Sequence, residues 1–268
     1  MRQYISSSCP DKDGLLTISE KDFRYLRNVL RLKIGDMIHA RFPNDELRAM
    51  TVCKIDDKSR KIVMQVCGPE NSSQKGENQP EETASIENSE FFLFMSVPKS
   101  SKFDLIVRQA TECGISKIIP VQTEFSQKGS EKMNFRSERF ERIIKEARQQ
   151  SGSPISTKIT ECKDLAGAAE FWKNESGNLS ENEKIAFVLY ERNRSTSSIA
   201  EIFDKIRSEK NPPHLRKIAL FCGSEGGISP DEIKFLKKSG FVPVHLKTNI
   251  LRCETAALYG IAAVQSLL

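Results

Sequence analysis

The hydrophobic pattern changes character along the chain. In residues 1–70, apolar and polar side chains alternate over short runs, at 50–55 and 61–66, between turn-rich segments. This two-residue period predicts half-buried strands, and therefore a small, mostly β domain. From residue 91 onward, apolar runs alternate with longer helical patterns; the runs cover 91–97, 117–121, 185–190 and 217–221. That rhythm is typical of an α/β domain with a parallel sheet and crossover helices, here over 91–268.

A polar segment separates the two patterns. Residues 71–90 are rich in Asn, Ser, Gln, Gly and Glu, and they contain almost no large apolar side chains. Such a composition buries too little apolar surface to order itself. We predict a linker or flexible loop over 71–90.

Local signals mark the ends of two helices in the second part. Ser229, Pro230 and Glu232 stand where a capping box places its serine, its first-turn proline and its glutamate. Gly240 and Gly114 follow helical stretches, at positions where a left-handed residue closes a helix. We therefore predict helices that begin after Ser229 and end before each glycine.

The segment with the most chemical information follows the apolar run at 217–221. Gly223, Gly226 and Gly227 occupy a turn between that predicted strand and the capped helix, with Glu225 among them. Glycines let a ligand approach main-chain amides closely, and ligands of open α/β sheets bind beyond the carboxyl ends of the strands. The turn matches neither the dinucleotide fingerprint nor the P-loop. A tight strand-to-helix turn with no ligand explains the pattern equally simply.

A second strand, turn and helix follow at 244–256. Arg252 and Glu254 lie at the start of the last helix, where they suit either a ligand site or an ordinary ion pair. The helix predicted over 254–268 is apolar on nearly all sides, which indicates burial against more than one surface. One of those surfaces is expected to belong to another subunit.

Two groups of basic residues offer phosphate contacts. One lies on a helix predicted over 137–150 and the other surrounds Tyr25; they comprise Arg139, Arg142, Lys145 and Arg148, and Arg24, Arg27, Arg31 and Lys33. A solvated helix face with ordinary i,i+4 ion pairs explains the first group as well. The second group also fits a surface helix that turns Leu26, Val29 and Leu30 toward the β core.

Composition narrows the class of protein. The chain has 268 residues, 38% of them hydrophobic and 29% charged, with a net charge of +5. It lacks the roughly 20 consecutive apolar residues of a membrane-spanning helix and a signal-peptide pattern, so we expect a cytoplasmic protein without a membrane partner. Seven scattered cysteines, odd in number, suit reduced thiols, and three separated histidines offer little material for a metal site.

These segments together resemble the RsmE family, which methylates N3 of a uridine in small-subunit ribosomal RNA and belongs to the knotted SPOUT superfamily. The matches span nearly the whole chain in order; they are 29–31 with 35–36, 98–99, 110–112 with 114, 119–120, 223 with 225–227, and 250–252 with 254–256. Each match is short, and the specificity comes from their order and spacing.

The resemblance implies a PUA-like β-barrel that binds RNA, followed by a trefoil-knotted α/β domain that binds S-adenosylmethionine and forms a homodimer. The implied cofactor-binding residues are Gly223, Glu225, Gly226, Gly227, Leu246, Lys247, Ile250 and Leu251. Arg252 and Glu254 are the implied catalytic residues, with Glu225 as an alternative proton acceptor. RNA contacts are expected from Arg24, Arg27, Arg31, Arg139 and Arg142. The alternatives are methylation of another ribosomal or transfer RNA position, and an RNA-binding relative without catalysis whose Lys247 fills the cofactor pocket.

Several positions depart from the family pattern. Ser224 replaces a proline, which we expect to loosen the glycine turn. Lys247 replaces a glycine that permits close approach, and Asn249 replaces an arginine. Further departures are Gln149, Ser153, Tyr25 and Asn28. They affect the RNA target more than the fold.

Overall fold

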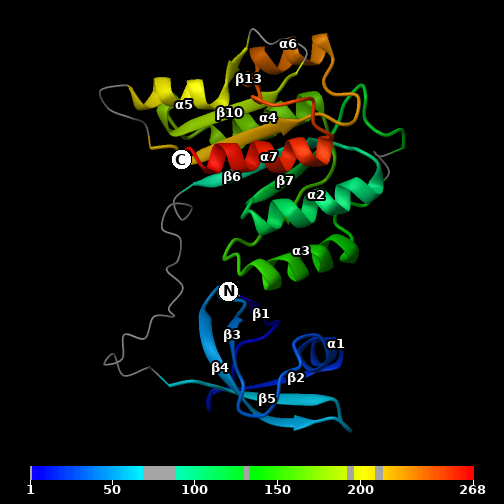
Figure 1. Ribbon diagram of the computed structural model, residues 1–268, viewed down its shortest axis with the longest axis vertical. Helices are drawn as coiled ribbons and strands as arrows, with labels where there is room; N and C mark the ends of the chain where they lie inside the picture. Colours follow the sequence, from blue (N-terminus) through cyan, green and yellow to red (C-terminus); the bar gives the residue numbers. More distant parts are fainter. Residues whose placement is uncertain (1, 69–88, 130–132, 192–195, 209–213) are drawn as a thin grey trace. The chain divides into compact units, whose positions relative to one another are not determined.

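The computed structural model describes residues 2–68, 89–129, 133–191, 196–208 and 214–268 (Figure 1). The chain forms two compact units. The first unit consists of Met1–Glu81 with Arg148–Pro154, and the second of Glu82–Ala147 with Ile155–Leu268. Of the predicted linker, residues 71–88 lie outside the described part of the chain.

The first unit is built on a five-stranded sheet in the order β1-β3-β4-β5-β2. Its strands are β1 (Gln3–Ile5), β2 (Leu15–Ser19), β3 (Met37–Arg41), β4 (Leu47–Asp56) and β5 (Lys61–Val66). The pairs β3·β4, β4·β5 and β2·β5 are antiparallel, whereas β1 runs parallel to β3. The alternating runs at 50–55 and 61–66 thus form the long hairpin of this sheet, and Met50, Ile62 and Met64 turn fully buried side chains into its core.

A short helical segment packs on this sheet. Helix α1 (Glu20–Arg24) continues directly into the π-helical turn η1 (Tyr25–Val29). Leu26 is fully buried in the core, but Val29 is 62% exposed, so only part of the face expected to meet the core does so. The π-helical turn has more than 3.6 residues per turn, and it rotates Val29 away from the position that an α-helical pattern predicts.

The second unit holds an eight-stranded parallel sheet. Its strand order is β11-β13-β10-β12-β6-β7-β8, with β9 also paired to β7. The strands are β6 (Glu90–Ser96), β7 (Lys117–Gln122), β8 (Lys158–Ile159), β9 (Lys163–Asp164), β10 (Lys184–Leu189), β11 (Ser197–Ser198), β12 (Lys217–Cys222) and β13 (Val242–His245). The four apolar runs read from the sequence are its central strands β6, β7, β10 and β12. The mixed α/β class predicted for this part is therefore observed.

Helices cover both faces of the sheet, because successive side chains of a buried strand point to opposite sides. Phe91, Leu93 and Met95 of β6 join one core cluster, and Phe92 and Phe94 join another. The first cluster includes residues of α2 (Ser100–Glu112), α3 (Glu138–Ser151), α5 (Ile199–Arg207) and α7 (Cys253–Gln265), and the second includes residues of α4 (Leu165–Ser176) and α6 (Pro230–Lys238). A 3-10 turn, η3 (Glu181–Glu183), leads into β10.

Trp172 of α4 lies in the second cluster. Its side chain is 5% exposed, and its ring centroid is 5.8 Å from that of Phe92 in an edge-to-face arrangement. Phe94 and Phe241 complete this aromatic group. Edge-to-face pairs of this kind add to the energy of burial alone.

The helix boundaries follow the local signals. Ser229 caps α6 in a full capping box with Glu232, and Pro230 is the first helical residue. Gly114 and Gly240 have φ values of 75° and 89°, and each follows a helix that it closes. None of the described helices combines the length and apolar character needed to cross a bilayer.

Candidate functional site

The glycine turn at 223–227 and the turn at 250–252, both identified from the sequence, line one cavity. The cavity has a volume of about 390 Å³ and lies where β10 and β12 end. The predicted residues that line it are Gly223, Glu225, Gly226, Gly227, Ile250, Leu251 and Arg252. Its other walls include apolar side chains of Leu189, Ile228 and Ala256. Its size is within the range of sites for small molecules.

Packing explains the glycines of the first turn. A Cβ atom on Gly226 would lie 2.5 Å from Cβ of Phe125, and one on Gly223 would lie 2.7 Å from the carbonyl carbon of Gly227. Gly227 itself has a φ of 76°, which favours glycine. Packing and backbone conformation therefore explain these glycines without a ligand, as the tight-turn interpretation predicts. The same turn also forms one wall of the cavity.

Ser224 fastens this turn. Its hydroxyl donates a hydrogen bond to the carbonyl oxygen of Phe125 at 2.6 Å, and the residue is 5% exposed. We expected a serine in this position to loosen the turn. The hydrogen bond supplies a restraint in place of the proline ring.

The second turn contributes unequally to the cavity. Ile250 and Leu251 line it, whereas Leu246 is buried in the apolar core, and neither Leu246 nor Lys247 is among the described lining residues. The ammonium group of Lys247 lies 3.1 Å from the carboxylate of Glu201, and its side chain is 63% exposed. The structure thus disagrees with the alternative in which Lys247 fills the pocket.

Arg252 occupies the junction between the second turn and α7. It is the N-cap residue of that helix, lines the cavity and is exposed. Glu254 lies in the first turn of α7 with a side chain only 14% exposed, next to the lining residue Cys253 but not itself among the described lining residues. Its carboxylate pairs with the ammonium group of Lys102, so this contact replaces the simple Arg252–Glu254 pair considered from sequence.

Lys102 is the lining residue that sequence analysis missed. Its Nζ atom lies 3.3 Å from Oε1 of Glu225 and 3.4 Å from Oε2 of Glu254. It comes from the first turn of α2, so three segments distant in sequence converge on one ammonium group. The local sequence around residue 102 carries no signal for this, because the contact depends on how α2, α7 and the glycine turn assemble.

These contacts keep the three side chains charged. Burial tends to raise the pKa of Glu225 and of Glu254, but backbone hydrogen bonds and the Lys102 ammonium outweigh it, and each pKa lies below its ordinary value. Burial tends to lower the pKa of Lys102, but the two carboxylates outweigh it and raise that pKa. We name this arrangement of Lys102, Glu225 and Glu254 the lysine bridge.

Two cysteines complete the cavity wall. Burial raises the pKa of the Cys253 thiol to about 12, and burial also raises the pKa of Cys222. The Cys253 thiol donates to Oε2 of Glu254 at 3.3 Å. Both thiols are therefore neutral hydrogen-bond donors near pH 7 and poor nucleophiles.

Of the predicted RNA-binding arginines, Arg27 is half-buried and the others are exposed, and not all of them are free of contacts. Arg27 pairs with Asp57 at 3.1 Å, Arg139 pairs with Asp104, and Arg142 is 71% exposed near Glu146. Arg24 and Arg31 are also exposed. Their positions leave the phosphate-binding role a prediction.

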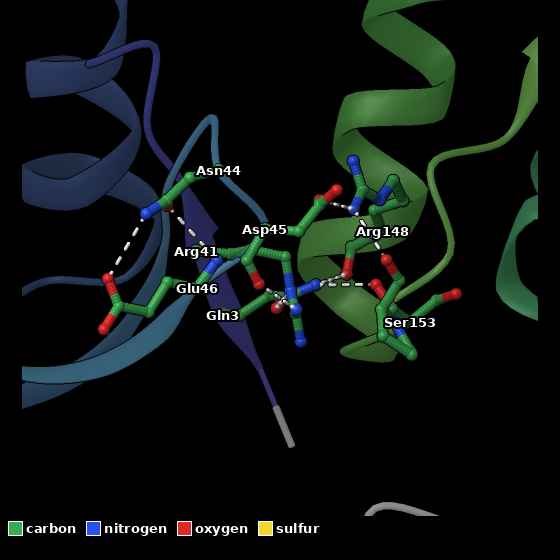
Figure 2. A network of polar contacts seen from close by, with 8 residues as sticks. Gln3, Arg41, Asn44, Asp45, Glu46, Arg148 and Ser153 are labelled. Carbon is green, nitrogen blue, oxygen red and sulfur yellow. Dashed lines mark hydrogen bonds and ion pairs between the residues drawn. The ribbon is translucent and has the colours of Figure 1, made fainter. Parts of the chain in front are cut away.

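Arg148 differs from the other arginines of α3 because it is buried. Figure 2 shows it beside Gln3, whose amide group donates to the carbonyl oxygens of Arg148 and Ser153 at 3.1 and 3.0 Å. The guanidinium of Arg148 donates to the carbonyl oxygen of Pro154 at 3.0 Å. Arg41 donates to Gln3 at 3.0 Å and thereby completes the network. Arg148–Pro154 consequently belongs to the first unit, although its sequence lies within the part assigned to the α/β domain.

The cavity can hold a flat, partly apolar ligand that carries a positive charge. Apolar side chains form part of its wall, and the glycine turn exposes main chain to it. The lysine bridge places two carboxylates against one ammonium group at one side. Apolar walls, accessible main chain and nearby carboxylates together suit a nucleoside whose tail carries a positive charge.

The family model for the RNA methyltransferase domain matches residues 85–265. Ribosomal RNA small subunit methyltransferase E 2 of Borreliella burgdorferi is 29% identical over 272 residues, which cover 100% of this chain and 98% of that protein. These matches confirm the resemblance to the RsmE family.

Two solved structures share the fold. A ribosomal RNA small subunit methyltransferase E from Neisseria gonorrhoeae, bound to S-adenosyl methionine, has a TM-score of 0.73 at 19% identity and covers 100% of this chain and 98% of its own. A putative methyltransferase from Legionella pneumophila, in complex with the same cofactor, has a TM-score of 0.71 at 18% identity and covers 99% and 98%. Because the family model spans more than half of the sequence, the chain belongs to the family of RNA methyltransferase domains.

Proposed function

We propose that the chain transfers a methyl group from S-adenosylmethionine to N3 of a uridine in small-subunit ribosomal RNA. The observation that carries the proposal is the single cavity shared by the glycine turn and the 250–252 turn, with Arg252 at its wall. The family match and the relatives named for small-subunit ribosomal RNA support the substrate class. Ribosomal RNA as substrate would place the reaction in the cytoplasm, as the sequence predicts.

Gly223, Gly226, Gly227, Ile250 and Leu251 would hold the cofactor with main-chain amides and apolar walls. Leu246 supports the second turn from the core. Lys247 supports it through the contact with Glu201. When bound, S-adenosylmethionine supplies a methyl group already activated by a positively charged sulfur, so the protein has mainly to position and desolvate the acceptor.

Arg252 and Glu254 would act on the acceptor ring. Uracil N3 carries a proton at neutral pH, and this proton must leave as the N–C bond forms. We assign the proton to one carboxylate of the lysine bridge, either that of Glu254 or that of Glu225, which lines the cavity. The guanidinium of Arg252 offers two donors to the flanking carbonyl oxygens and stabilises the negative charge that spreads onto them.

The first unit would bind RNA as a PUA-like β-barrel, and the second would carry the trefoil knot of the SPOUT superfamily. Arg24, Arg27 and Arg31 would contact phosphates in the first unit, as Arg139 and Arg142 would in the second. Such contacts weaken steeply with salt. Binding of ribosomal RNA fragments measured between about 50 and 200 mM salt tests this role.

A homodimer would cover the apolar surface of α7. Tyr259 of α7 is 46% exposed and Leu105 of α2, which packs beside α7, is 42% exposed. Apolar exposure of this kind on adjacent helices suits a second copy of the chain. Light scattering after gel filtration should give twice the chain mass, and Tyr259→Glu should give the monomer mass.

Methyl transfer to small ribosomal subunits, followed by mass spectrometry of the nucleosides, tests the proposed reaction. The wild-type chain should yield 3-methyluridine, and Arg252→Ala should lower turnover by about 100- to 1000-fold while cofactor binding survives. Arg216→Ala is the matched control, because Arg216 is 57% exposed and pairs with Glu183 of η3. Equal turnover of Arg252→Ala and the parent would contradict the assignment, and a methyl group on another nucleoside would favour the other RNA position.

A further inference from the structure

The lysine bridge joins three segments that meet at the cavity wall. Lys102 contributes from α2, Glu225 from the glycine turn and Glu254 from α7. The Glu225 carboxylate also accepts a hydrogen bond from the backbone N–H of Lys99 at 3.4 Å. The glycine turn is thus held to the amino-terminal end of α2 by two contacts.

The bridge has one cation and two carboxylates. Both carboxylates approach one nitrogen within 3.4 Å, so they repel each other unless the ammonium lies between them. The other titratable groups here are the Cys253 thiol, which donates to Glu254, and the described lining residues Tyr190, Glu191, Cys222 and Arg252. With the carboxylates, the ammonium and the guanidinium charged and the thiols and the phenol neutral, the described charged side chains of the bridge and the cavity wall carry one more negative than positive charge.

We infer that Lys102 is a positioning residue that holds Glu225 and Glu254 as a fixed anionic pair, which favours the positively charged methyl donor over its neutral demethylated product. The inference rests on the proposed function and adds a selectivity to it. The sulfonium of the donor carries a positive charge that the thioether of S-adenosylhomocysteine lacks. A preorganised negative charge therefore binds the donor more tightly and lets the product leave.

Lys102 sets the protonation of the pair. Its charge stabilises both carboxylates in their ionised forms, in agreement with the lowered pKa values of both glutamates. Without the ammonium, mutual repulsion would raise the pKa of one carboxylate toward neutrality. The same bridge keeps Glu254 unprotonated, as a proton acceptor must be.

Calorimetric titration of the full chain with S-adenosylmethionine and with S-adenosylhomocysteine, at about pH 8 and about pH 6, tests the inference. The wild-type chain should bind each ligand with an affinity that changes less than about twofold between the two pH values. Lys102→Met should bind the methyl donor about tenfold more weakly at the lower pH, because one pKa unit is a factor of ten. Its affinity for the neutral product should stay nearly constant.

Two further variants separate charge from packing. Lys102→Arg keeps the cation and should restore the wild-type pH behaviour. Lys234→Met removes a lysine that is 72% exposed and pairs with Asp231 on α6, so it should behave as wild type. Equal affinity of Lys102→Met for the donor at both pH values would overturn the inference alone, as would an equal loss for donor and product.

A second measurement does not depend on Lys102. Glu254→Gln removes one charge of the pair, and the ratio of donor to product affinity should fall by about tenfold at pH 8. An unchanged ratio would overturn the inference even if Lys102→Met does not fold. A wild-type chain that binds neither ligand would overturn the proposed function together with this inference.

Discussion

The two ends of the parallel sheet carry similar charged side chains in different settings. At the amino ends, Lys117 of β7 and Lys217 of β12 lie 2.6 and 3.6 Å from the Glu175 carboxylate, and Lys217 lies 3.1 Å from Glu90. At the carboxyl ends, Lys102 lies between Glu225 and Glu254. Two cations balance two carboxylates at the first end, whereas one ammonium group is shared by two carboxylates in the lysine bridge.

The surroundings explain what each cluster does. The ammonium groups of Lys117 and Lys217 lie 5.2 and 5.7 Å from the ring centroid of Phe92, so they cover an aromatic side chain of the core. The lysine bridge instead borders the cavity. Charged clusters occur both in structural positions and at functional sites. The lysine bridge differs from the other cluster because it borders a cavity and has one cation for two carboxylates.

Gly226→Val should have the largest effect of a single change. The added atoms would collide with Phe125, because even a Cβ atom would lie 2.5 Å from Cβ of that residue. The glycine turn would have to move, and cofactor affinity should fall by more than about 100-fold. Gly68→Val is the control, since a Cβ there meets no atom within 4 Å. Calorimetry that gives equal affinities for Gly226→Val and the parent would remove this turn from the site.

Glu175→Ala should disrupt the charged cluster at the amino ends of the strands and leave the cavity unchanged. The change leaves Lys117 and Lys217 facing each other without their shared carboxylate, and unfolding free energy should fall by about 1 to 2 kcal/mol. Glu181→Ala, at a side chain that is 90% exposed, should cost less than about 0.5 kcal/mol. Denaturant titration gives these values, and calorimetry should show unchanged cofactor affinity. A large affinity loss in Glu175→Ala would erase the contrast between the two ends.

The bridge should also affect stability in a defined pH window. The pKa of Glu254 is lowered in the folded chain, so its stabilisation is complete above the ordinary value of 4.5 and disappears as the pH falls through the lower folded value. Glu254→Gln should therefore lower the unfolding free energy at pH 7 by less than about 1 kcal/mol. Thermal unfolding below pH 4.5 should show the two proteins converging, and a difference that grows toward acid would contradict the sign.

The smallest expected effect is the alkylation of the cavity thiols Cys222 and Cys253 in the folded chain. Burial raises the pKa of Cys253 to about 12, so its thiolate is about 1 part in 10,000 at pH 8. Cys9 and Cys53 are exposed. Iodoacetamide followed by peptide mass spectrometry should modify these two first and leave Cys222 and Cys253 intact until the chain unfolds. Modification of Cys253 as fast as Cys53 would show that the cavity wall opens readily.

Sequence alone predicts the elements whose signals are local. The apolar runs identify strands β6, β7, β10 and β12, and Ser229 with Pro230 fixes the start of α6 to the residue. Periodicity and capping depend on a few consecutive positions, so they can be read without knowledge of the fold. The glycine turn is recognisable for the same reason.

Other features depend on contacts between segments that are distant in sequence, so local patterns do not predict them. Phe125 lies beneath Gly226, and Lys102 meets two carboxylates more than 100 residues away. Arg148 is buried within the first unit although its spacing suits an exposed basic face. The π-helical turn exposes Val29, and this exposure is not predicted because no simple sequence period indicates a π-helical turn.

The chain contains a single tryptophan, Trp172, within the aromatic cluster of the second unit. Fluorescence excited selectively at the long-wavelength edge of tryptophan absorption therefore reports the melting of that unit, because the first unit contains tyrosines but no tryptophan. Circular dichroism senses the backbone of both. A temperature ramp followed by the two signals together would reveal whether the units melt in one cooperative event or in sequence.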